Sequence, residues 1–176
     1  MQDYLFMTGF AASAFGIAPN NNCVKSNAAQ RLVVKALSAV ASYTGHTVGY
    51  GVGGSASAGG FGPFGFNFGA SQQLLVSPDG TAGLATTYTK QVFSVASKGA
   101  GAIGGLQLTA SSAQTFSDSS GLSLDVGASL ADGVGVGIDH SFSGGNYAST
   151  LTLGAGFGGQ GHAGTFTFTI ATPFCQ

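Results

Sequence analysis

Residues 122–130 read LSLDVGASL, and residues 134–142 read VGVGIDHSF. In both stretches every second residue is apolar or bulky, and the residues between them are small or polar. A β-strand turns successive side chains to opposite faces, so this period of two predicts two strands with one bulky face and one small face each. Ala131, Asp132 and Gly133 between them have the composition of a tight turn. The whole segment is therefore predicted to form an antiparallel hairpin.

Turn lengths decide which residues face each other, because a slip of one residue would move every bulky side chain to the other face. The first turn, with three residues, pairs Val126 with Ile138. A two-residue turn at residues 145–146 then pairs His140 with Leu151. Both pairings set bulky residues against bulky residues, which favours an antiparallel meander that continues to the last strand.

Looser signals of the same kind occupy the region before this hairpin. With the downstream strands they make about eight strands, each connected to the next. A closed up-and-down barrel leaves no exposed edge and is the predicted fold, with a two-layer sandwich as the alternative. The upstream strand candidates are residues 46–59, 64–77, 81–96 and 103–116.

One amphipathic helix is predicted ahead of the strands. Asn27 and Gln30 have the spacing of a capping box, and Gly45 is a stop signal. We divide the chain into an apolar N-terminal segment with this helix, residues 1–45, and a glycine-rich barrel, residues 46–176. The helix packs across the sheet or plugs the barrel end, or it lies on a membrane surface. On a membrane, four apolar residues would contact lipid: Leu32, Val33, Leu37 and Val40.

Charge is scarce along the whole chain. Of 176 residues only 6% are charged, while 44% are hydrophobic and 31 are glycine. The five Lys and Arg residues form no basic stripe, which excludes nucleic acid as a partner. If the bulky strand faces point inward, the outside is a neutral coat of small residues. If they point outward, the outside needs lipid, and strands of nine residues such as 122–130 have the length that crosses a bilayer.

The apolar stretch at residues 4–18 is too short for a membrane-spanning helix and lacks the flanking charge of a signal peptide. Gly9 and Gly16 interrupt it, and it is shorter than the roughly 20 residues that a spanning helix needs. No Lys or Arg precedes it, so the cationic start of a signal peptide is missing.

Cys23 and Cys175 stand near the two ends of the chain. A disulfide between them would close a long loop and would point to an oxidising compartment. Their spacing matches no zinc or redox motif, so the other interpretation is two unpaired thiols.

Few residues carry recognisable chemistry. Asp125 and Asp139 are expected to face each other across neighbouring strands on the small face, where they would share a cation or a proton, or else stand as solvated surface groups. Ca²⁺ is the candidate ion, although it takes six to eight oxygen ligands. His46, His140 and His162 occur without a nucleophile motif and without any Glu in the chain. No catalytic residue is therefore assigned, and an enzyme site around the two Asp and one His is kept as an alternative.

Several segments resemble the glycine-rich C-terminal modules of rearrangement-hotspot (Rhs) and related polymorphic-toxin proteins. The segments are SPDGTAGLA at residues 77–85, VGVGIDH at 134–140, Asn-Tyr at 146–147, and Gly-His at 161–162 ahead of a Thr/Phe-rich strand. Where that family carries an acidic residue near the Gly-His pair, this chain has Gln160. The resemblance covers the glycine-rich region from its first strand onward.

The resemblance implies an antibacterial effector that is secreted or delivered into a rival cell. It further implies release from a larger carrier protein and neutralisation by an immunity protein. Because the residues indicate no catalytic group, we expect a toxin that damages or inserts into a lipid membrane without a cofactor. Two alternatives remain: a secreted barrel that self-assembles or adheres as a homo-oligomer, and the enzyme described above.

Overall fold

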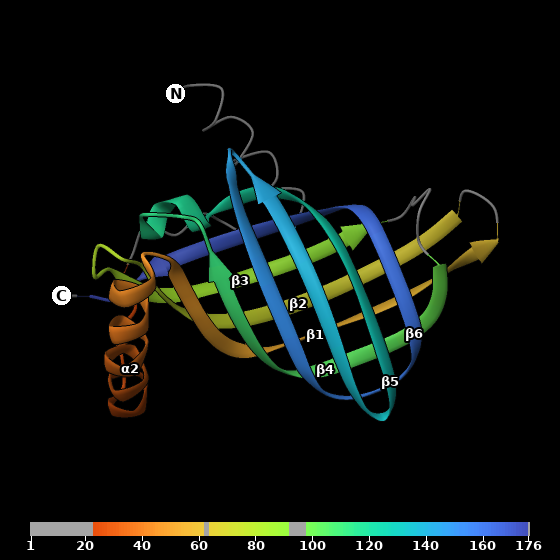
Figure 1. The fold of residues 1–176 in the computed structure, drawn as a ribbon, viewed down its shortest axis with the longest axis horizontal. Coiled ribbons are helices and arrows are strands. Elements are labelled where there is room, and N and C mark those ends of the chain that lie inside the picture. Colours follow the sequence, from red (N-terminus) through yellow and green to blue (C-terminus); the bar gives the residue numbers. More distant parts are fainter. Residues whose placement is uncertain (1–22, 62–63, 92–97, 176) are drawn as a thin grey trace.

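A computed structural model of the chain describes residues 23–61, 64–91 and 98–175. It contains one helix followed by an antiparallel sheet of six strands, as the mainly β prediction required (Figure 1). The predicted apolar stretch at residues 4–18 lies outside the described residues. The elements are α2 (Ala28–Thr44), β1 (Thr47–Phe61), β2 (Phe64–Val76), β3 (Ala82–Gln91), β4 (Lys98–Ser111), the 3-10 helix η1 (Phe116–Ser119), β5 (Gly121–Ser143) and β6 (Asn146–Pro173).

Helix α2 begins and ends at the predicted signals. The backbone N–H of Gln30 donates to Asn27 Oδ1 over 2.8 Å, and the N–H of Asn27 donates to Gln30 Oε1 over 2.9 Å. This capping box satisfies two of the backbone donors that a helix start leaves free. Gly45 ends the helix with a φ of 68°, a left-handed conformation that favours glycine.

Hydrogen bonding in the sheet runs round a ring rather than along a simple meander. The strand order is β3-β2-β1-β4-β6-β5, and β3 also pairs with β6. Strand β6 bonds to β4 through residues 148–161 and to β3 through residues 167–173, so one long strand connects both edges of the sheet β1 to β4. The expectation that each strand pairs with the next is wrong at β3 and β4, which are consecutive in the chain but are not neighbours.

The C-terminal region forms two long, bent strands joined by a hairpin turn, where the sequence predicted four shorter strands. β5 and β6 pair along their full length, from Gly121 opposite Thr169 to Ser143 opposite Asn146. β5 bends back where Gly133 has a φ of 78°, and its halves then lie side by side (Figure 1). Six strands therefore replace the eight that the turns predicted.

The pairing register differs from the predicted one by two residues. His140 lies opposite Ser149, and Ile138 lies opposite Leu151. The turn between β5 and β6 is Gly144-Gly145, one residue earlier than predicted. A shift of two keeps every side chain on its predicted face, because strand side chains alternate with a period of two.

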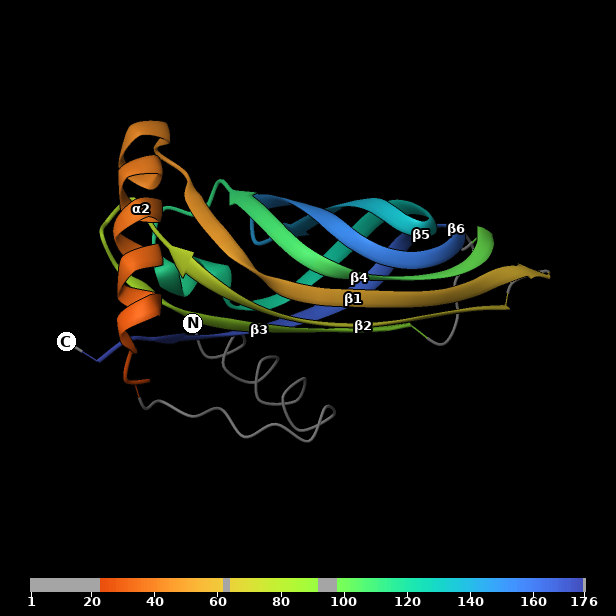
Figure 2. The ribbon, with the colours of Figure 1, turned by 90° about the horizontal axis from the view of Figure 1, so that it is seen from below.

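Helix α2 packs across one end of the sheet (Figure 2). Ala41 forms a buried cluster with Val48, Leu74 and Val76 of the first two strands. Val33 and Leu37 are partly buried and pack against this cluster, so they face the strands, while the expected lipid contact of α2 stays a prediction. Leu32 and Val40 point away from it and are exposed.

The disulfide holds both ends of the described chain at the helix end of the sheet. Cys23 is bonded to Cys175, with 4.8 Å between their Cα atoms. Beside the bond, Val24 forms a parallel bridge with Phe174. Of the two alternatives left open by the sequence, the structure contains the disulfide.

Candidate functional site

The strands carry their apolar side chains outward and their polar side chains inward. Along the start of β5, buried and exposed residues alternate strictly, and the exposed ones are Leu122, Leu124 and Val126. The buried ones are Ser123 and Asp125. The outward apolar face includes members of five strands: Val52, Phe66, Leu108, Leu124, Val136 and Leu153.

Charged residues on the described outward strand faces gather at one end of the sheet. Lys90 and Asp132 lie in one cross-strand row at the end remote from α2, and Asp132 is at the bend of β5. His140 lies toward the end near α2, on an outward position of β5, and its Nδ1 is 2.8 Å from Ser149 Oγ. From the row of Lys90 and Asp132 to the end near α2, the described outward strand faces carry no Lys, Arg, Asp or Glu.

Hydrogen-bonded polar side chains span the space between the strands. Gln73 Nε2 of β2 donates to Gln107 Oε1 of β4 over 2.9 Å, and Gln107 Nε2 donates to Thr152 Oγ1 of β6 over 3.2 Å. Another such hydrogen bond joins Thr109 Oγ1 of β4 to Thr150 Oγ1 of β6 over 2.8 Å. Such bonds satisfy polar groups that would otherwise be costly to bury.

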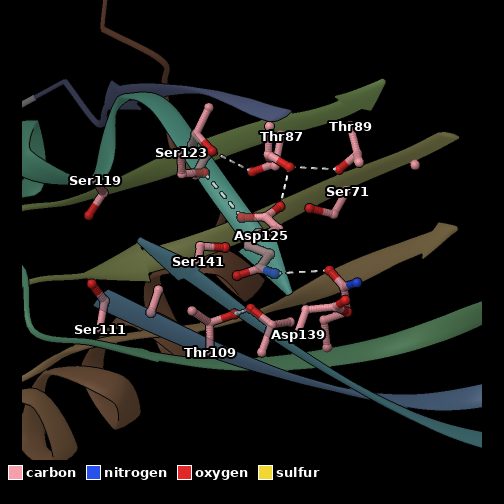
Figure 3. A pocket seen from close by; sticks show the side chains of 18 of the residues that line it. Ser71, Thr87, Thr89, Thr109, Ser111, Ser119, Ser123, Asp125, Asp139 and Ser141 are labelled. Atoms are coloured by element: carbon pink, nitrogen blue, oxygen red, sulfur yellow. Dashed lines mark hydrogen bonds between the residues drawn. The ribbon is translucent and has the colours of Figure 1, made fainter. Parts of the chain in front are cut away.

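A cavity of about 160 Å³ remains among these side chains. Figure 3 shows hydroxyl groups and the carboxylates of Asp125 and Asp139 in its wall, and Asp118, Leu75 and Ile103 also line it. The lining extends from Ser119, Ser143 and Tyr147 at the end near η1 to Asn67 and His162 farther along the strands. The cavity is therefore a site with many polar groups, lying inside strands whose outer faces are apolar.

Asp125 points into this cavity from β5 and is almost fully buried. Thr167 Oγ1 donates to its Oδ2, and Ser123 Oγ donates to its Oδ1 over 3.3 Å. Thr167 is also within 3.2 Å of Thr89 Oγ1, which extends the network to β3 (Figure 3). All of these partners are neutral hydroxyl groups.

Asp139 reaches the same cavity from the other half of β5. Its Oδ1 lies 3.3 Å from Nε2 of His162, which is itself almost fully buried. Asp125 and Asp139 are not the directly facing pair that the predicted register required, because Asp139 lies against Gly127, two residues along β5 from Asp125. They share one cavity because β5 bends back and brings both halves to it.

Several residues of this site carried no signal of their own in the sequence. Asn67, Gln73, Gln107 and Thr152 are buried polar residues on the small faces of three strands. Large amides on a face otherwise occupied by Gly, Ser and Thr are the feature that could have indicated a polar interior. His46 lies at the start of β1, outside the cavity lining, so the structure brings only His162 to the two carboxylates.

Metal coordination by a full set of side chains is not found here. Within the described ranges, no three His, Cys, Asp or Glu side chains are arranged to hold a metal ion. The expected Ca²⁺ ion would have Asp125, Asp139 and neutral oxygens as its ligands, whereas Ca²⁺ takes six to eight oxygens, usually several from carboxylates.

None of the helices in the described part of the chain has the length and apolar character needed to cross a bilayer. No protein-family model matches the chain, and comparisons with curated proteins and with solved structures found no significant match.

Proposed function

We propose that the protein inserts into a lipid bilayer as a closed β-barrel whose apolar outer face contacts acyl chains. The observation that supports this most is the orientation of the strand side chains, apolar outward and polar inward, over five of the six strands. Monomeric water-soluble proteins rarely expose a continuous apolar patch of more than a few hundred Å². In a bilayer, an apolar outer face of this kind is stable against acyl chains, and the polar interior of the barrel can remain hydrated.

The pattern of backbone pairing supports the same proposal. In a bilayer core each unpaired backbone group costs several kcal/mol, so strands cross it only when they close on themselves. The β3–β6 pairing joins the two edges of the sheet β1 to β4 through one strand. Lipid-facing strands of this kind alternate apolar and polar residues and confine charge to their ends. Lys90 and Asp132, both at the end of the sheet remote from α2, agree with that requirement.

Lipid explains the outer face better than either alternative does. Self-assembly through strand edges would need a free edge. Among the described strands β5, which pairs with β6 alone, could supply one, but pairing there would leave the apolar outer faces of the other strands uncovered. An enzyme site around Asp125, Asp139 and His162 would use the cavity but would leave the apolar outer face without a role.

A single-tryptophan reporter tests insertion, because the chain contains no Trp of its own. Leu153→Trp places the reporter on the outward face of β6, and Tyr43→Trp places it on the solvent side of α2. In phospholipid vesicles we expect blue-shifted emission from the first variant, quenched by brominated acyl chains. The second should emit as in water and be quenched by iodide. Iodide quenching of both, without bromolipid quenching of either, would exclude insertion.

Membrane damage as an antibacterial effector is a further part of this proposal, supported by the resemblance to polymorphic-toxin modules. Insertion is the physical step that a non-catalytic effector of this kind requires. Release of a trapped dye from vesicles of bacterial lipids measures it directly. Vesicles that hold their dye while the Leu153→Trp reporter is buried in lipid would leave insertion intact and remove the toxic function.

A further inference from the structure

The interior cavity is lined by carboxyl groups, and none of the described hydrogen-bond donors to Asp125 is a cationic side chain. Three carboxylates line the cavity, from Asp118, Asp125 and Asp139, and none of its described lining residues is Lys or Arg. Asp118 is exposed near η1, where its Oδ2 accepts from the Thr115 N–H over 3.1 Å. Asp139 has His162 within 3.3 Å. Asp125 is the buried carboxylate whose hydrogen-bond donors are all neutral.

A second observation concerns a buried oxygen in the wall of the same cavity as Asp125. Asn67 of β2 is only 1% exposed and lines the cavity, and its Oδ1 accepts no hydrogen bond. Its Nδ2 lies 3.4 Å from Thr165 Oγ1, and Thr165 is the residue directly opposite Asp125 on β6. A buried acceptor left unpaired costs about 1–3 kcal/mol, so a group that coordinates or donates to it would stabilise the fold.

We propose that this cavity binds a small singly charged cation, an alkali metal ion or a primary ammonium group, against Asp125 and Asn67. Both occupants share the chemistry that the site offers, which is one carboxylate surrounded by hydroxyl and amide oxygens. A single charge matches the single buried carboxylate that lacks a basic partner. A divalent ion of the Ca²⁺ type takes six to eight oxygens, with several carboxylates among them.

The proposed occupant fits the space and the chemistry of the wall. The cavity of about 160 Å³ holds an alkali ion with several waters, or a small alkylammonium ion. The wall near Asp125 offers Ser141, Thr87 and Thr89 as further oxygen ligands (Figure 3). The site goes beyond membrane insertion, because it belongs to the folded interior and is measured in detergent micelles without a bilayer.

Thermal unfolding in micelles at constant ionic strength tests the proposal. Choline chloride is replaced stepwise by sodium, potassium or methylammonium chloride. A ligand that binds only the folded state raises the midpoint temperature in a concentration-dependent manner. We expect such a rise with at least one of these ions, and comparison of the metal and methylammonium series identifies the occupant. Equal midpoints in choline and in all three ions would overturn the proposal.

Asp125→Asn and Asp132→Asn provide the matched variants. Both remove one carboxylate, but Asp132 is exposed at the bend of β5 and is not among the cavity-lining residues. Asp125→Asn removes one unit charge close to the bound cation, so the affinity for the cation should fall by about fivefold or more. Asp132→Asn should bind as the original chain does. If the midpoint temperature rose equally with cation concentration in both variants, the assignment of the site to the cavity would be overturned.

A measurement on the unaltered chain keeps the test decisive if Asp125→Asn does not fold. The ²³Na resonance broadens when sodium exchanges with a protein site, and an ion competing for that site narrows it again. We expect broadening beyond that of empty micelles, reversed by potassium or by methylammonium. A linewidth equal to that of empty micelles, together with an unchanged midpoint in potassium and methylammonium, would exclude the site.

Discussion

Oδ1 of Asp139 lies 3.3 Å from Nε2 of His162, and both side chains pass close over Gly127 in the other half of β5. A methyl group on Gly127 would sit 2.0 Å from Asp139 Oδ1 and 2.8 Å from His162 Cε1. Gly127 thus leaves the space in which a partly exposed acid and a buried histidine meet. The pair connects β5 with β6 on the inside of the ring.

The first prediction concerns this close approach. Gly127→Ala should lower the free energy of unfolding by about 1–3 kcal/mol, because the added methyl forces the Asp139–His162 pair apart. Gly104→Ala is the control, since a methyl there would have no atom nearer than 3.7 Å. Denaturant unfolding in micelles measures both variants. Equal stability of the two would mean that the pair does not restrict Gly127.

A second prediction concerns the cost of charge on the outward face. Leu106 lies between Val52 and Leu153, which are also exposed apolar residues. Leu106→Lys should reduce the free energy of insertion by about 2–4 kcal/mol, as expected for a charge at the bilayer midplane. Leu130→Lys, near the bend of β5, should cost only about 0–1 kcal/mol because its ammonium reaches the headgroups. Folding titrations into vesicles give both values, and equal costs would contradict a bilayer position.

Helix α2 offers a third test, with two leucines on different sides of one element. Leu37 packs against the cluster of Ala41, Val48 and Leu74, whereas Leu32 is 73% exposed. Leu37→Ala should destabilise the fold by about 1–3 kcal/mol, somewhat less than a fully buried leucine would. Leu32→Ala should change stability by less than about 0.5 kcal/mol. A larger effect at Leu32 in vesicles than in micelles would indicate that this side of α2 contacts lipid.

The disulfide is the subject of the fourth prediction. Cys23→Ser combined with Cys175→Ser should lower stability by about 2–5 kcal/mol, because the bond closes a loop with a sequence separation of 152 residues. Reduction of the original chain should give the same loss under identical conditions. Denaturant midpoints with and without reductant provide the measurement. A reduced chain as stable as the oxidised one would show that the bond does not restrict the unfolded state.

Local patterns predicted the local structure well. The capping box at Asn27 and Gln30 and the left-handed Gly45 marked both ends of α2, because capping depends on residues within one turn of each other. The alternation in 122–130 also predicted which residues share a face of β5. It left open which face points outward, since the same pattern serves a water-soluble sandwich and a lipid-facing sheet.

Long-range pairing was beyond these patterns. Nothing near β4 in the sequence indicates that its neighbours are β1 and β6, because such ladders depend on segments far apart in the chain. The register at His140 was missed by two residues, since bulky and small residues alternate equally well in either register. The meeting of Asp125, Asp139 and His162 follows from the bend of β5 and the long pairing with β6. The sequence predicts that the two carboxylates meet and keeps a site with one His as an alternative, but it does not indicate that His162 is the histidine beside them.

The Cys23–Cys175 bond also decides how the chain responds to pulling. Force applied through the segments outside residues 23 and 175 would pass across the sulfur bridge and bypass the strands enclosed by it. A transporter that threads extended polypeptide would meet a covalent ring at this point. Passage through such a channel would therefore require the thiol form of both cysteines.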